Sequence, residues 1–432
     1  MFFINGIILT IASIIIRFAG LSFNVYISNM TSPEAVGIFS LVMSVYFFFI
    51  TVATSGLSMA TTCIVSEEFA KGNKELAIKT VRTCILFSFL LGIIAMVIIC
   101  LCSNLLSSIC LGNRISNKVF YFIAIGLPFI AMSSCINGYF TAIRKSYKTA
   151  ISQIFELMIK IIATILLLKF NINNGIEAIC ISLILGDVIA EICSFTLCFV
   201  LYLKDNIIAQ KGLKYFFSIS NSRKIFKSSY PVALTSYIRS GLTTLTQLII
   251  PIRLEKSGLS ATLALSQYGI IQGMVMPILL FPNVLISSFC GLLIPEFSTY
   301  LAKGYKKSIR NSCKKILIIS CIFSFLIASI FFFFSNELSL LIYKNIESSL
   351  YIKLLSPLVF FIYIDNIIDA ILKGLNKQFE VMCCNVVDLA ITIGFIYFLV
   401  PIFGIYGFIA SIYISELFNF AVSSYQLSSS LS

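Results

Sequence analysis

Permanent positive charges stand inside long apolar runs of this chain, where they could bind an anion. Arg17 lies in the stretch ASIIIRFAGLSF and Arg239 lies in SYIRSGL. A charge at the centre of a bilayer costs at least a few kcal/mol, so such a residue usually faces a bundle interior or an aqueous cavity. Guanidinium suits an anion because its planar fork grips phosphate in a bidentate manner. The two arginines predict an anion site, and the alternative is that an acidic residue of the same half, such as Asp187 or Glu416, neutralises each one.

Carboxylates in the apolar runs are candidates for binding a proton or a small cation. Glu156 has Lys160 four residues further on, in the favourable order for an ion pair, so these two could neutralise each other. The corresponding residue in the second half, Asp388, has Thr392 at that spacing and no cation. We therefore expect Asp388 to find another partner or to bind a proton.

Two further carboxylate pairs stand four residues apart and share a helix face. Asp187 and Glu191 could share a proton or serve helix packing. Asp365 and Asp369 have a spacing that can hold magnesium against a diphosphate, as in membrane prenyltransferases. Such enzymes need two acidic motifs and this chain offers one, while Lys373 supplies a partner for Asp369. Cavity lining or a helix-end ion pair is therefore the prediction here, with no enzyme activity and no metal.

The elements that position these charges are membrane helices. The 432 residues are 59% hydrophobic and 11% charged, too little polar surface for a soluble globule. Each helical span needs about 20 apolar residues, and the alternating segments of about 10 residues that build outer-membrane barrels are absent. The sequence has no histidine, which removes the usual general base and metal ligand. We predict an all-α integral membrane protein with about twelve transmembrane helices.

The connections between the predicted spans indicate their orientation. Lys and Arg concentrate in the even-numbered connections, so the positive-inside rule places both termini in the cytoplasm. The net charge of +13 is therefore a topology signal, and no basic soluble module is present to bind nucleic acid. Pro277 and Pro282 should bend the eighth span, either to fit the packing or as a hinge. The predicted spans are 5–28, 36–63, 81–104, 118–140, 149–169, 175–203, 230–252, 264–294, 314–335, 351–373, 379–401 and 403–425.

The two halves of the chain repeat each other. FAKGNKE at 69–75 matches LAKGYKK at 301–307 at an offset of 232, and Arg17 falls opposite Arg239 at an offset of 222. Because six spans per half is an even number, both halves enter the membrane the same way round, with a substrate cavity expected at their interface. The predicted division is an N-lobe at 1–203, a basic amphipathic linker on the inner leaflet at 204–229, and a C-lobe at 230–432.

A block of 46 residues at 253–298, RLEKSGLSATLALSQYGIIQGMVMPILLFPNVLISSFCGLLIPEFS, carries a family resemblance together with 56–73 and 138–156. It resembles the stage V sporulation protein B branch of the multidrug/oligosaccharidyl-lipid/polysaccharide exporter superfamily. The resemblance implies a MATE-like V of two pseudo-symmetric six-helix lobes in the bacterial cytoplasmic membrane. It also implies a flippase that moves an anionic undecaprenyl-diphosphate-linked saccharide by alternating access. Cell-envelope polysaccharide, peptidoglycan or spore-cortex synthesis would use that cargo.

The resemblance also implies roles for particular residues. Arg17 matches the arginine of the family's R-x-x-G pattern in the first span, which lines the cavity and contacts the diphosphate. Many members carry a second arginine where this chain has Asn24, so Arg239 could complete the site, and Arg253 joins the substrate-binding set. No cofactor is expected; coupling would use H⁺, Na⁺ or the membrane potential, and membrane lipids and envelope-synthesis enzymes are the expected partners. The alternative is a cation-coupled MATE-type multidrug exporter. The ion-coupling candidates are Asp388, Glu156, Asp187, Asp365 and Asp369.

Overall fold

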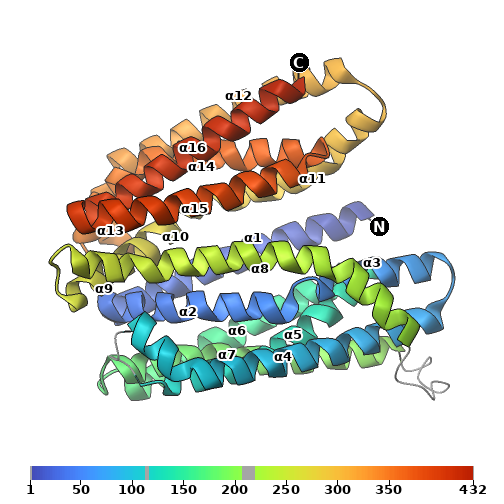
Figure 1. Ribbon diagram of the computed structural model, residues 1–432, viewed down its shortest axis with the longest axis horizontal. Helices are drawn as coiled ribbons and strands as arrows, with labels where there is room; N and C mark the ends of the chain where they lie inside the picture. The colour runs from blue at the N-terminus through green and yellow to red at the C-terminus, as the bar shows by residue number, and fades with distance from the viewer. Residues whose placement is uncertain (1, 112–115, 207–218, 432) are drawn as a thin grey trace. The chain divides into compact units, whose positions relative to one another are not determined.

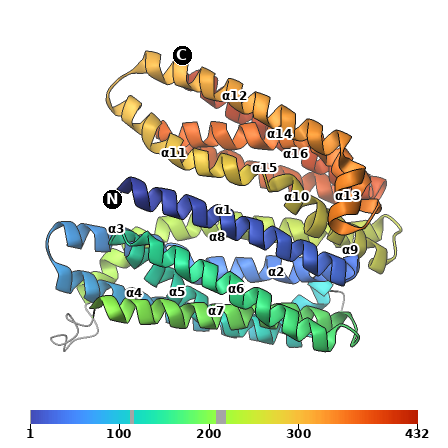
Figure 2. The ribbon, with the colours of Figure 1, turned by 180° about the vertical axis from the view of Figure 1, so that it is seen from behind.

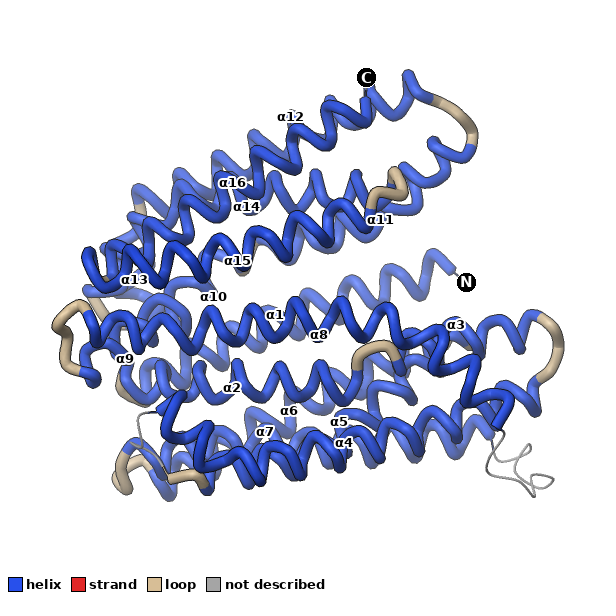
Figure 3. Tube along the Cα trace, viewed as in Figure 1, coloured by secondary structure: helices blue, strands red, loops and turns tan. Residues whose placement is uncertain are grey.

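The computed structural model describes residues 2–111, 116–206 and 219–431, and all the secondary structure in these ranges is helical (Figure 3). A helix satisfies its backbone polar groups without water, so long apolar runs cross a membrane in this form. Eleven described stretches are long and apolar enough to do so. The predicted all-α class is confirmed.

The helices follow the predicted spans closely (Figure 1). The first half contains α1 (Phe2–Met30), α2 (Pro33–Thr54), α3 (Leu57–Ala70), α4 (Lys74–Leu111), α5 (Lys118–Ala142), α6 (Ser146–Asn171) and α7 (Ile176–Asn206). The second half contains α8 (Ile219–Lys256), α9 (Ala261–Gly269), the π-helical turn η2 (Ile270–Val275), α10 (Met276–Leu280), α11 (Asn283–Ala302), α12 (Lys306–Phe333), α13 (Ser335–Tyr343), α14 (Glu347–Gly374), α15 (Gln378–Phe403) and α16 (Ile405–Leu431).

The predicted eighth span, 264–294, is interrupted rather than continuous. The chain forms the π-helical turn η2 and then breaks between α10 and α11 at Phe281 and Pro282. Proline has no backbone N–H to continue the helix ladder, which accounts for the second break. Each side of it, 261–280 and 283–302, is long and apolar enough to count as a separate span.

The internal duplication is confirmed by the packing inside each half. Helix α4 packs on α5, α6 on α7, and α5 also packs on α7 and α3; the second half repeats this pattern with α12 on α14, α15 on α16, and α14 on α16 and α11. Two turns recur at the predicted offset of 232. Gly72 and Gly304 both have positive φ, as do Arg144 and Asn376.

By packing, the chain divides into two compact units. Unit 1 contains residues 1–20 and 41–244, and unit 2 contains residues 21–40 and 245–432. This assignment differs from the predicted division for two segments, and the packing of each segment accounts for the difference. In unit 2, Gly37 of α2 lies against the backbone of Leu265 in α9. In unit 1, Thr244 of α8 donates a hydrogen bond to the carbonyl of Ser44 at 3.0 Å.

The predicted linker at 204–229 is described only at its ends. Residues 204–206 complete α7, and residues from 219 onwards begin α8. The predicted amphipathic segment between them, 207–218, lies outside the described residues. The domain boundaries therefore stay a prediction.

Two tyrosine hydroxyls donate hydrogen bonds to backbone carbonyls near the helix interruptions. Tyr343 of α13 donates to the carbonyl of Met274 in η2 at 2.9 Å, and Tyr363 of α14 donates to that of Leu279 at 2.6 Å. Both hydroxyls are buried. Unpaired backbone groups at membrane depth cost several kcal/mol, so a broken helix persists only where a neighbour supplies a partner.

Tyr343→Phe and Tyr363→Phe each delete one oxygen and remove a buried hydrogen bond to a backbone carbonyl. We expect each to cost about 1–3 kcal/mol and to lower the melting temperature by a few degrees. The buried thiols of Cys84 and Cys135 allow unfolding of the detergent-solubilised protein to be followed with a thiol-reactive fluorophore. Tyr425→Phe is the control, because Tyr425 is 75% exposed. An equal melting temperature for all three variants would contradict this role.

Candidate functional site

The two predicted anion-binding arginines lie within long helices of unit 1. Arg17 stands 13 residues before the end of α1, and Arg239 stands 17 before the end of α8. Both side chains are exposed in the structure. Within the described part of the chain, neither guanidinium pairs with a carboxylate. Asp187, the alternative partner considered within the first half, is occupied by Lys160.

The other two predicted substrate-binding residues belong to unit 2. Asn24 is exposed on the part of α1 that packs with this unit. Arg253, in the last turn of α8, places its guanidinium 3.4 Å from the ring centroid of Tyr397 in α15. Such stacking is a favourable cation–π contact, and it fixes the direction of the Arg253 side chain.

The carboxylates of unit 1 gather between α6 and α7. Lys160 of α6 forms an ion pair at 2.6 Å with Asp187 of α7, so it reaches across to the neighbouring helix rather than pairing with Glu156 on its own. Glu156 lies beside Ser194 of α7. The sequence predicted that Glu156 and Lys160 could neutralise each other, but in the structure Lys160 pairs with Asp187 of the neighbouring helix. Helix-to-helix geometry decides this, because an i,i+4 spacing permits a contact without requiring it.

Glu191 has a partner that sequence reasoning missed. The hydroxyl of Tyr46, in α2, donates to Oε2 of Glu191 at 2.5 Å, and both side chains are buried. Gly126 of α5 makes room for this pair, because a Cβ at that position would come within 2.2 Å of Glu191 and 2.6 Å of Tyr46. A tyrosine in an apolar run gives no sign of its partner, since the two residues are 145 positions apart.

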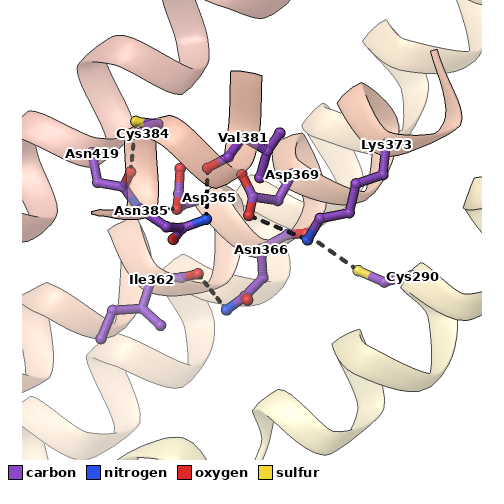
Figure 4. Close-up of polar contacts among 10 residues, drawn as sticks. All are labelled: Cys290, Ile362, Asp365, Asn366, Asp369, Lys373, Val381, Cys384, Asn385 and Asn419. Atoms are coloured by element: carbon purple, nitrogen blue, oxygen red, sulfur yellow. Dashed lines mark hydrogen bonds and ion pairs between the residues drawn. The ribbon is translucent and has the colours of Figure 1, made fainter. Parts of the chain in front are cut away.

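Two carboxylates of α14 in unit 2, Asp365 and Asp369, contact polar groups within reach of α14 (Figure 4). Oδ2 of the buried Asp365 accepts a hydrogen bond from the side-chain amide of Asn419 in α16 at 2.7 Å. The side-chain Oδ1 of Asn419 in turn accepts one from the Cys384 thiol of α15 at 3.1 Å. Asp369 forms the expected helix-end ion pair with Lys373 at 3.4 Å. The structure thus gives each member of the Asp365 and Asp369 pair a different partner.

Asp388 of α15 has no cation four residues further on, and we expected it to find another partner; the structure supplies one. Its Oδ1 accepts from Ser415 of α16 at 2.6 Å, and Thr392 contacts the same serine at 2.8 Å. Glu416, the neighbour of Ser415, lies close enough to Asp365 and Asp388 to interact electrostatically with both. Sequence reasoning did not place Glu416 in this cluster, although its spacing from Asn419 on one helix face was a usable signal.

The two clusters differ in charge. In unit 1, Lys160 pairs with Asp187. In unit 2 the described lysine, Lys373, pairs with Asp369, while Asp365 and Asp388 accept hydrogen bonds from the neutral donors Asn419 and Ser415. Several carboxylates close together in a low dielectric carry a large free-energy cost unless they gain a positive charge. Carboxylate, amide and hydroxyl oxygens are also the ligands that hard cations prefer. These carboxylates are chemically suited to take up a proton, although among the described residues no group of three or more Asp, Glu, Cys or His side chains is arranged to hold a metal ion.

The helices match solved transporter structures. An inward-facing multidrug resistance MATE family transporter of the MOP superfamily gives a TM-score of 0.69 at 12% identity, covering 98% of both chains. A MOP superfamily transporter from Pyrococcus furiosus gives a TM-score of 0.66 at 13% identity, covering 99% of this chain and 96% of the other. The chain is a multi-pass membrane protein with the two-lobe MATE transporter fold, as the resemblance implied.

Two proteins of Bacillus subtilis (strain 168) are similar in sequence. Stage V sporulation protein B is 23% identical over 416 residues, 94% of this chain and 79% of the relative. Lipid II flippase MurJ is 26% identical over 181 residues, 39% of this chain and 33% of the relative. The model of the polysaccharide biosynthesis protein family matches residues 3–301. The chain belongs to this family.

Removing one member of the Lys160–Asp187 pair should destabilise the protein more than breaking a surface pair. Lys160→Met or Asp187→Asn leaves a charge without its partner, and we expect the free energy of unfolding to fall by about 2–4 kcal/mol. This loss is smaller than for a fully buried pair, because 31% of the Lys160 side chain is exposed. The double variant should lose less than the two single losses combined, because no orphaned charge remains. Unfolding in a denaturing detergent, followed with the thiol-reactive fluorophore, measures these differences.

The control is Glu75→Gln, which breaks the Lys79–Glu75 pair of 2.8 Å, in which the carboxylate side chain is 68% exposed rather than 7% as at Asp187. Surface pairs of this kind are worth less than about 1 kcal/mol. Additive losses in the Lys160 and Asp187 double variant would show that the two side chains act independently.

Proposed function

We propose that this chain is a flippase that moves an anionic polyprenyl-diphosphate-linked saccharide across the membrane by alternating access. The cargo keeps all its bonds, so the protein is a transporter and not an enzyme. We place it in the bacterial cytoplasmic membrane with both termini in the cytoplasm, beside the enzymes of envelope synthesis. The fold, the polysaccharide biosynthesis family and the similarity to stage V sporulation protein B and to a lipid II flippase support this proposal.

The observation that carries the proposal is the exposed guanidinium of Arg17 far from either end of α1. A cation at that depth without a described carboxylate partner needs water or an anionic ligand. Arg239 of α8 has the same properties. A diphosphate offers several oxygens to such a pair, and bidentate hydrogen bonds to guanidinium are among the strong polar contacts. Asn24 and Arg253 would contact the remainder of the headgroup.

We further propose that an ion gradient drives the transport through the carboxylate clusters. Asp388 and Asp365 in unit 2 would bind Na⁺ or H⁺, since their described partners are neutral donors. Glu156 and Asp187 in unit 1 would respond to the same gradient through Lys160. Asp369 would tune the unit 2 cluster, because it already pairs with Lys373.

A cation-coupled multidrug exporter is the second candidate, and the buried carboxylates of both units favour it. The two candidates differ in the charge of the cargo. A multidrug exporter of cationic drugs would raise the resistance of a drug-sensitive host, whereas a site built on arginines would repel such compounds. Expression in that host separates the candidates.

Arg17→Ala and Arg239→Ala should each reduce flipping of a polyprenyl-diphosphate-linked sugar in proteoliposomes by about 10–100-fold. This is the range expected when a charged group loses a hydrogen-bonded partner worth about 1.5–3 kcal/mol. The measurement is the rate at which the fluorescently labelled sugar becomes accessible on the opposite face. The amount of reconstituted protein should be unchanged.

Arg310→Ala is the matched control, because it removes an exposed arginine near the start of α12. It should leave the rate within about twofold of the parent, since exposed substitutions away from a site have small effects. Normal flipping by the Arg17 and Arg239 double variant would overturn the proposal. Magnesium-dependent formation of a new product, lost in Asp365→Asn, would instead indicate an enzyme.

Asp388→Asn should remove the dependence of the flipping rate on an imposed Na⁺ or pH gradient while leaving slow downhill movement intact. The amide can still accept from Ser415, but it can no longer bind a cation as a carboxylate does. The control is Glu380→Gln, an exposed carboxylate in the first turn of the same helix. A gradient response equal to that of the parent would contradict a coupling role for Asp388.

A further inference from the structure

A groove of about 520 Å³ runs along unit 1 between two helices that both pack on α5. Helices α4 and α7 form its walls, and both run beside α5 in the two opposite views (Figures 1 and 2). This volume is typical of a site for a small ligand or one chain of a larger one. Its lining includes Arg82, Leu86 and Phe89 of α4, Met132 of α5, and Phe199 and Tyr202 of α7.

One end of the groove is polar and positively charged. The guanidinium of Arg82 is half-buried beside the hydroxyl of Tyr202. Arg82 is the charged side chain among the residues that line the groove, and its positive charge favours an anionic ligand. Further along α7, beyond the lining residues Tyr202 and Leu203, Lys145 and Lys148 share the carboxylate of Asp205 at 3.0 and 2.7 Å.

The rest of the groove is apolar and open. Leu86, Phe89 and Phe199 leave 37–38% of their surfaces exposed. The aromatic wall continues along α7, because the ring of Phe199 stacks on that of Phe195 at 5.7 Å, and Phe195 lies 5.7 Å from Phe129 of α5. Such a surface on spanning helices faces hydrocarbon, and a chain lying along it would contact aromatic rings throughout.

We propose that this groove binds an anionic phospholipid of the surrounding membrane, with its phosphate at Arg82 and one acyl chain along the wall formed by Leu86, Phe89 and Phe199. Arg82 stands eight residues inside the start of α4, about 12 Å along the axis, and a long arginine side chain can direct its charge toward the headgroup layer while its stem lies on apolar surface. Basic pockets between membrane helices are suited to anionic headgroups.

A phospholipid fits this groove better than the transported cargo does. Neither Arg17 nor Arg239 lines the groove, so it is separate from the proposed diphosphate site. All its lining residues belong to unit 1, so the site is complete within one compact unit. The bound lipid would hold α4 and α7 together over Met132 and so stabilise that unit. The inference does not depend on which cargo the protein moves.

Native mass spectrometry of the full-length protein in detergent tests this site with defined lipids. Phosphatidylglycerol should give bound adducts and raise the melting temperature, whereas phosphatidylcholine of the same chain length should do neither. Arg82→Gln should reduce the phosphatidylglycerol adducts by about fivefold, the effect expected for one cation at the membrane surface. Arg82→Lys should retain part of the binding, because lysine keeps the charge without the planar fork.

Two further variants keep the proposal testable if Arg82→Gln fails to fold. Leu86→Trp fills the groove and leaves Arg82 in place, so it should abolish the adducts while preserving the charge. Arg310→Gln removes an exposed arginine from α12, the counterpart of α4, and should leave the adducts unchanged. Equal binding of both lipids, or equal adducts in Arg82→Gln and Arg310→Gln, would overturn the proposal. Displacement of phosphatidylglycerol by equimolar undecaprenyl phosphate would also overturn it, by assigning the groove to the cargo lipid.

Discussion

The buried carboxylates of this protein are held by side chains of neighbouring helices, because a charge in an apolar interior is costly unless a partner compensates it, and the arrangement of the helices depends on that constraint. In unit 1, Asp187 is held by Lys160 and Glu191 by Tyr46, which ties α7 to both α6 and α2. In unit 2, Asp365 is held by Asn419 of α16. An unpaired charge at such positions would cost more than most single packing contacts contribute. These charged residues thus hold neighbouring helices together and are also candidate functional groups.

The same constraint governs the backbone. The second half interrupts its helices twice between α9 and α11, and tyrosines from α13 and α14 pair carbonyls close to those interruptions. In unit 1, Tyr237 of α8 donates to the carbonyl of Val52 at 3.0 Å, a few residues before α2 ends. Irregular backbone is tolerated at membrane depth only where protein groups replace water. The ring buries apolar surface while its hydroxyl serves the carbonyl, which makes tyrosine suited to this role.

The duplicated halves share a packing pattern but differ in charge. Equivalent helices pack in both units, and the turns at Gly72 and Gly304 have the same handedness. Lys160 supplies a cation to one cluster, whereas Thr392 occupies the corresponding place in the other and contacts Ser415. One scaffold therefore carries two electrostatic environments.

The sequence by itself determined the all-helical membrane class, the approximate spans and the repeat. The class and the spans follow from hydropathy over stretches of about 20 residues, and the repeat follows from short motifs such as FAKGNKE that recur in the second half. It also predicted that Asp388 needs a partner other than a cation four residues on, and that Asp369 pairs with Lys373, since spacing along one helix predicts which side chains share a face. Only the tertiary structure decided that Lys160 pairs with Asp187, that Tyr46 binds Glu191, and that Arg82 and Phe199 line one groove. These partners come from different helices, and the rotation of one helix against another is set by packing of the whole bundle, which no local pattern encodes.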